Sequence, residues 1–142
     1  MLAHPAQMEF FRLAIQHFPH HLSDRVIDSS SLDIDGGSHR EINASECVGV
    51  DLAPGANVDL VSREEDFPLP YGPFDVAMSS ECFEHNERWE EILKNLHRLA
   101  KPGGLGIFSC ATVDRAEHGS KRSDRGFSAP FVTAGGAVVL PQ

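Results

Sequence analysis

Two carboxylates stand out in this 142-residue chain, because each closes a short apolar run and a glycine-bearing loop separates them. Asp28 ends the run 25–28, and Asp51 ends the run 47–51, twenty-three residues later. An acid about 20 residues beyond such a loop is the arrangement that holds a ribose, since a carboxylate accepts two hydrogen bonds from a vicinal diol. The alternative for either acid is an ordinary strand-end carboxylate that nearby backbone amides satisfy.

The loop after Asp28 bears on which kind of nucleoside would bind. It contains three serines and the pair Gly36-Gly37, but no GxGxxG turn to cradle a pyrophosphate. A nucleoside cofactor without phosphates therefore fits better than a dinucleotide. A nucleotide-sugar or dinucleotide enzyme on a related sheet remains a less favoured alternative.

A strand–helix–strand unit over residues 74–111 would position this chemistry. The apolar runs 74–78 and 105–110 suit buried parallel strands, whose carboxyl ends form the ligand-binding edge of an open α/β sheet. Between them, Asn86 is the expected N-cap and Pro102 with two glycines the expected stop. The helix has one apolar stripe at spacings of three and four: Trp89, Ile92, Leu93, Leu96 and Leu99.

The rest of the chain supplies the remaining elements. The pattern predicts a helix over 8–18, strands over 25–28, 47–51 and 58–61, and a polar loop over 62–72. We expect one domain over 1–142, with a secure core at 25–111. The tail, 112–142, has little periodicity, although 131–140 would suit a small hairpin.

Composition narrows the class of protein. The net charge of −9 makes a nucleic-acid backbone an unexpected partner, and the acidity serves solubility. No apolar run approaches the ~20 residues of a membrane span, and no secretory signal is visible. The three cysteines form no CxxC pair, which favours reduced thiols in a cytoplasmic protein.

The order of these motifs resembles a known family. FDVAMSSECFEHNERWEEILKNLHRLAKPGG, preceded by GVDLAPGANVDLV and DFPLPYGPFD, is similar to the class I S-adenosylmethionine-dependent methyltransferases of type 11. SLDIDGGSHREI is similar to one subgroup of that family. The resemblance covers residues 25–111. It implies a Rossmann-like three-layer αβα sandwich, mainly parallel, with strand order 3-2-1-4-5 and the last antiparallel strand pair missing or truncated.

The resemblance also implies a set of cofactor-binding residues for S-adenosylmethionine. Asp28 would contact the amino group of the cofactor or bound water, and Asp51 would bind the ribose with Leu52 beside it. Asp66 with Phe67 would flank the adenine. The remaining members are Ser30, Gly36, Ser79 and Ser80, of which the last two would line the floor beneath the sulfonium.

Two features of the first loop leave alternatives. Ser30 stands where the family usually has glycine, which puts a side chain at a close approach of backbone and ligand. A second register would make 32–34 the strand and Asp33 the acid. We favour the first register, because Val26-Ile27 is the better buried strand core.

The acidic turn before the helix holds the candidates for catalysis. Glu84 and His85 would serve as general base if the methyl acceptor is a neutral hydroxyl. With Glu81 they stand at i, i+3 and i+4, and related methyltransferases bind a divalent metal with an E-x-x-E-H pattern. Asn86 replaces the further histidine, so we favour no metal and a role in shaping the substrate entrance.

The expected function is methyl transfer to a small-molecule or sugar-like acceptor. The alternative is a cofactor-binding or scaffold module of the same fold that has lost catalysis. Only five strands are secure, so the fifth would be an exposed apolar edge. A truncated, minimal or homodimeric domain is therefore expected, with the partner subunit covering that edge in the last case.

Overall fold

The computed structural model describes residues 5–19, 25–29, 31, 44–68, 72–80, 82–83 and 86–110. Their elements are, in chain order, α1 (Pro5–His17), β1 (Arg25–Ser29), β2 (Glu46–Asp51), β3 (Leu60–Val61), η3 (Glu64–Asp66), β4 (Phe74–Ser80), α2 (Trp89–Leu99) and β5 (Ala100–Ser109). The tail hairpin predicted at 131–140 and the second-register strand at 32–34 lie outside these residues. The observed β1 falls where the first register places it.

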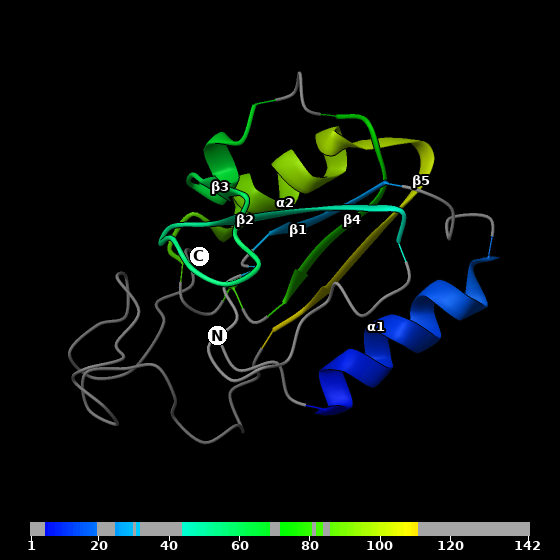
Figure 1. Ribbon diagram of the computed structural model, residues 1–142. Helices are drawn as coiled ribbons and strands as arrows, with labels where there is room; N and C mark the ends of the chain where they lie inside the picture. The colour runs from blue at the N-terminus through cyan, green and yellow to red at the C-terminus, as the bar shows by residue number, and fades with distance from the viewer. Residues whose placement is uncertain are drawn as a thin grey trace.

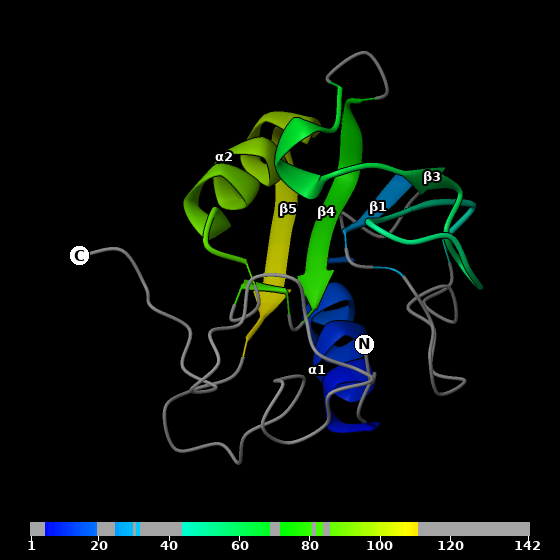
Figure 2. The ribbon, with the colours of Figure 1, turned by 90° about the vertical axis from the view of Figure 1, so that its left-hand side faces the viewer.

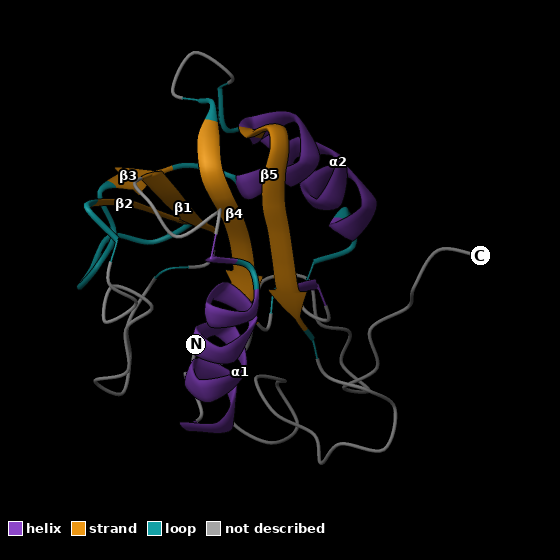
Figure 3. Cartoon of the chain, turned by 90° about the vertical axis from the view of Figure 1, so that its right-hand side faces the viewer, coloured by secondary structure: helices purple, strands orange, loops and turns teal. Residues whose placement is uncertain are grey.

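The five strands form one parallel sheet in the predicted order β3-β2-β1-β4-β5. Helix α1 lies on one face of the sheet and α2 on the other, which gives three layers (Figure 1). Figures 2 and 3 view the molecule from opposite sides, and in both α2 lies beside β5 while α1 lies at the lower end of β4. The described core is therefore the Rossmann-like α/β arrangement that the motifs predict.

Each face of the sheet has its own apolar cluster, because side chains alternate along a strand. On the α2 face the cluster includes Ile27, Val50, Phe74, Ala77 and the buried stripe of the helix. On the α1 face it is formed by Phe11, Ile15, Val26, Val76, Met78 and Ile107. Strand β4 is buried along its whole length, as a central parallel strand should be.

The boundaries differ from the sequence predictions at the two ends of α2. Arg88 is the N-cap, and Asn86 instead caps the preceding turn, its side-chain oxygen accepting the Arg88 N–H at 2.8 Å. Strand β5 begins at Ala100 rather than Leu105, directly after the helix. Lys101 precedes a proline and so favours an extended backbone, while Gly103 at φ 76° allows the irregular pairing between β4 and β5.

Candidate functional site

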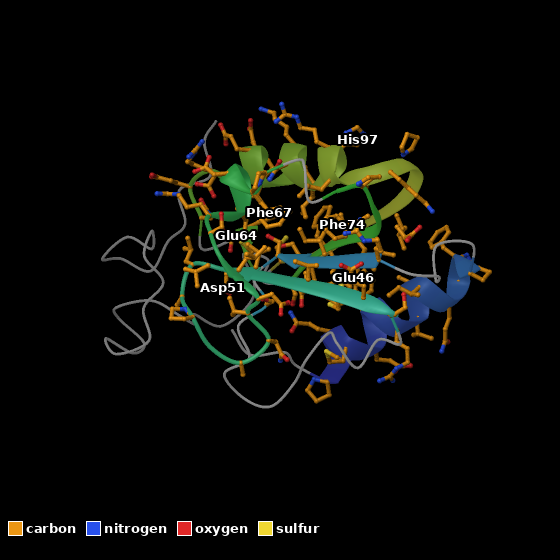
Figure 4. All side chains as sticks on the ribbon, turned by 45° about the horizontal axis from the view of Figure 1, so that its top comes forward. Glu46, Asp51, Glu64, Phe67, Phe74 and His97 are labelled. Atoms are coloured by element: carbon orange, nitrogen blue, oxygen red, sulfur yellow. The ribbon has the colours of Figure 1, made fainter. Side chains whose placement is uncertain are left out.

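Asp28 and Asp51 lie on the same face of the sheet near its carboxyl edge. Asp28 pairs with Gly49 across β1 and β2, and Asp51 follows two residues later, so the alternation that puts Val26 on the α1 face puts both acids there too. Asp28 is 2% exposed, whereas Asp51 is half-buried at the end of β2. Figure 4 shows Asp51 and Glu46 at opposite ends of that strand.

Ser79 and Ser80 point to opposite faces, since they are consecutive residues of β4. Ser80 shares the face of the two acids. Ser79 lies on the α2 face beside Ser29, its register partner in β1. Both hydroxyls of this pair are buried, at 0% and 3% exposure, and neither has a hydrogen-bond partner among the described residues.

Buried polar atoms without a partner are uncommon in folded proteins and call for an explanation. Two such hydroxyls on neighbouring strands, at the ligand-binding edge of the sheet, are an arrangement that a bound polar ligand would satisfy. Ser29 was not among the predicted site residues, although its place directly after the strand-end acid Asp28 was a usable signal.

Asp66 is the last residue of η3, and Phe67 follows it. Both lie on the α2 side of the sheet. Asp66 is exposed, and Phe67 is 3% exposed within the apolar cluster beneath α2. Figure 4 shows Phe67 and Phe74 between the sheet and the helix. The phenyl ring therefore packs in the core, so Phe67 has its backbone and Asp66 its carboxylate to offer a ligand.

Asn95 of α2 fixes this segment in place. Its buried side-chain amide donates to the carbonyls of Glu64 at 2.8 Å and of Phe67 at 3.2 Å. Glu65 adds ion pairs to Arg63 at 2.9 Å and to Arg88 at 3.1 Å. The Glu65 carboxylate raises the pKa of Arg63, chiefly through the hydrogen bond between them. Asn95 was not predicted from the apolar stripe of α2, because an amide on an apolar face gives no periodic signal.

Several predicted site residues lie outside the described part of the chain. They are Ser30, Gly36, Glu81, Glu84 and His85. Leu52 is described, and its side chain is 37% exposed beside Asp51. Within the described residues, no three His, Cys, Asp or Glu side chains are arranged to hold a metal ion. None of the described helices is long and apolar enough to cross a membrane.

A groove of about 590 Å³ lies away from these residues, between α2 and β5. It is lined by apolar and basic side chains, among them Leu93, His97, Arg98 and Phe108. None of the predicted cofactor-binding residues that the structure describes lines it, so within the described residues it is a feature of the β5 edge rather than of the candidate site.

Comparison with known proteins identifies the class. Residues 35–108, just over half of the chain, match the family model described as a methyltransferase domain. The chain therefore belongs to this family, the type 11 methyltransferases of class I, as its motifs indicate. The match includes Asp51 and Ser79 and begins after Asp28.

A relative gives a second comparison. The chain is 36% identical over 66 residues to the ubiquinone biosynthesis O-methyltransferase of Maricaulis maris (strain MCS10). That stretch is 46% of this chain and 23% of the relative, so the chain spans less than a quarter of that protein's length. No solved structure matches the chain.

Proposed function

We propose that this chain binds S-adenosylmethionine at the carboxyl edge of its sheet and transfers the methyl group to a small-molecule or sugar-like acceptor. The observation that carries the proposal is the set of polar groups gathered at that edge. Two acids, Asp28 and Asp51, lie on one face, and two buried hydroxyls without described partners, Ser29 and Ser79, lie on the other. A ligand lying across the carboxyl edge of the sheet would contact both the two acids and the two hydroxyls.

The donors and acceptors of this edge fit the cofactor. Asp51 is half-buried at the rim, where a carboxylate would accept both ribose hydroxyls. Exposed Asp66 would accept from the exocyclic amine of adenine, and exposed Leu52 would cover apolar surface of the nucleoside. Asp28 would hold the amino group of the methionine moiety, and Ser80 lies on the same face of the sheet as Asp28. Ser30 and Gly36 complete the proposed set.

The cofactor supplies an activated methyl group on a sulfonium that already carries its leaving group. The protein has to hold the acceptor in line, exclude water and take up a proton where the acceptor needs it. A neutral hydroxyl acceptor needs a base, and the proposal gives that role to His85 with Glu84. The name of the relative, an O-methyltransferase, favours an oxygen acceptor.

A catalytically inactive cofactor-binding module is the second candidate. Ser30 favours it, because a side chain replaces the glycine that usually lies against the cofactor. For either candidate we propose a cytoplasmic protein that forms a homodimer over the β5 edge.

A thermal-shift screen tests the proposal. A ligand that binds only the folded state stabilises it by about 2.7 kcal/mol when the free ligand is at a hundredfold excess over Kd, and so raises the melting temperature. We expect S-adenosylhomocysteine and S-adenosylmethionine to raise the melting temperature, and NAD and ATP to leave it unchanged. A shift with NAD alone would contradict the proposal. Methyl transfer from labelled S-adenosylmethionine in an acceptor panel then separates the active enzyme from the inactive module.

A further inference from the structure

Asp59, just before β3, holds both backbone groups of Gly49 in β2. Its carboxylate oxygen Oδ2 accepts the Gly49 N–H at 2.8 Å, and its own N–H donates to the Gly49 carbonyl at 2.9 Å. Gly49 lies two residues before Asp51 and on the same face of the sheet. Asp59 therefore extends the short β2–β3 pairing by one residue, back to Gly49, on the strand that carries the proposed ribose acid.

A side-chain carboxylate is needed there because the backbone ladder is broken. The β2–β3 register places Gly49 opposite Asp59, so in a regular parallel ladder the Gly49 N–H would go to the carbonyl of Val58. Asn57 has φ 66°, so the chain leaves the strand just before Val58, and the Asn57 carbonyl occupies the space beside Gly49 where a side chain would begin. A β-carbon at Gly49 would stand 1.8 Å from that oxygen. The Asp59 carboxylate takes the place of the missing carbonyl.

Ser31, two residues after the end of β1, meets the same point of β2 from the side of β1. Ser31 donates its N–H to the Val50 carbonyl at 3.1 Å, and its side chain approaches within 2.6 Å of where a Gly49 β-carbon would be. Gly49 has no side chain to anchor this part of β2 by packing. The position of Gly49, and with it the position of Asp51 at the carboxyl end of β2, therefore depends on the contacts with Asp59 and on the pairing of β2 with β1.

We propose that Asp59 is a positioning residue for cofactor binding, acting through Gly49 to fix Asp51 at the rim of the sheet. The inference rests on the proposed function. Strand β3 has only two residues, so the loss of one contact at its start removes a large share of the β2–β3 contacts, which support β2 on the side away from β1. A carboxylate that is displaced by more than about 0.5 Å can no longer accept hydrogen bonds from both hydroxyls of a diol.

The test is calorimetric titration of S-adenosylhomocysteine into variants of the complete chain. Asp59→Ala should weaken binding about tenfold, roughly 1.4 kcal/mol. Asp59→Asn should stay close to wild type, because its amide oxygen still accepts the Gly49 N–H. Adding Asp59→Ala to Asp51→Ala should weaken binding no further, because the two residues act as one unit. A merely structural role would lower stability and give no such coupling.

Amide hydrogen exchange of the ligand-free protein gives a second readout. Exchange at Gly49 should accelerate in Asp59→Ala and not in Asp59→Asn. Ile15→Val, which loosens the α1 face, is the control and should lower the melting temperature without changing affinity. If wild-type protein binds and Asp59→Ala binds equally well, this role is wrong while the proposed function stands. If wild-type protein binds no S-adenosylhomocysteine, both fail.

Discussion

The hydroxyls of Ser29 and Ser79 are the side-chain groups at this edge that the proposed binding of a ligand would satisfy. A buried hydroxyl without a partner costs free energy in the folded state, roughly 1–3 kcal/mol. Neither has a partner among the described residues, so this edge of the sheet carries polar groups that its own packing does not require. Binding sites commonly hold such groups at the expense of stability.

Replacing Ser79 by alanine should therefore separate stability from binding. We expect Ser79→Ala to keep the free energy of unfolding or raise it by up to about 1 kcal/mol, while the affinity for S-adenosylhomocysteine falls several-fold. Chemical denaturation and calorimetric titration measure the two quantities. Ser45→Ala, an exposed serine before β2, is the matched control and should change neither. A destabilised variant with unchanged affinity would show that Ser79 serves the fold alone.

The candidate site was predictable only where a residue follows from its place at a strand end. Asp28 and Asp51 were found because acids after apolar runs mark the carboxyl edge of a parallel sheet. Asn95 and Asp59 were missed because their contacts are with residues of other elements, whereas Ser29 could have been predicted from its place after Asp28. Asn95 contacts Glu64 and Phe67, about thirty residues away in sequence, and nothing local to α2 predicts that.

Among the strands and helices, the order of the sheet was predictable and the joints between elements were not. The resemblance to the methyltransferase family implied the strand order, while the apolar runs and the α2 stripe predict which segments form strands and which helix face is buried. The start of β5 at Ala100 and the cap at Arg88 depend instead on tertiary contacts. One such contact involves Asp75 in β4, whose carboxylate accepts from the Arg25 N–H at 2.9 Å and from the Lys101 ammonium.

This contact predicts a pH dependence of stability. The Lys101 ammonium, with the Arg25 N–H, lowers the pKa of Asp75 below its ordinary value. A carboxyl with a lowered folded-state pKa contributes stability that is present above the unfolded value of about 3.9 and is lost as pH falls through the folded pKa. Asp75→Asn should lower the free energy of unfolding at neutral pH by about 1 kcal/mol.

The difference between Asp75→Asn and wild type should shrink as pH falls from about 4 through the lowered folded-state pKa, below which wild-type Asp75 is neutral too. Urea denaturation of both proteins from neutral to acid pH measures this difference. A gap that stays constant with pH would mean that the Asp75 charge contributes nothing. Glu90→Gln, which removes an exposed pair to Lys94 at 3.8 Å, is the control and should have little effect at any pH.

For the molecule as a whole, the proposed homodimer concerns the β5 edge of the sheet. Among the described strands β5 pairs only with β4, and Phe108 is 44% exposed beside the groove. The outer face of α2 carries Glu90 and Glu91 in its first half and Lys94, His97 and Arg98 in its second. Figure 4 shows His97 on that outer side. Two copies related by a two-fold axis would bring acidic halves against basic halves.

The proposed homodimer predicts that a charge at this edge makes the protein monomeric. Phe108→Glu should convert the dimer to a monomer in size-exclusion chromatography with light scattering. Leu13→Glu, an exposed apolar residue on α1, should leave the dimer intact. A wild-type protein that is monomeric at all soluble concentrations would contradict the homodimer without touching the proposed methyl transfer.

The affinity of S-adenosylhomocysteine for wild-type protein and for Asp51→Ala tests the central claim most directly. Asp51 is half-buried at the rim, so its removal should leave the melting temperature of the free protein nearly unchanged. Calorimetric titration should show micromolar binding to wild type and a Kd at least about tenfold higher for Asp51→Ala, since two charge-assisted hydrogen bonds to the ribose are lost. Equal affinity of the two proteins would contradict the claim that Asp51 holds the nucleoside.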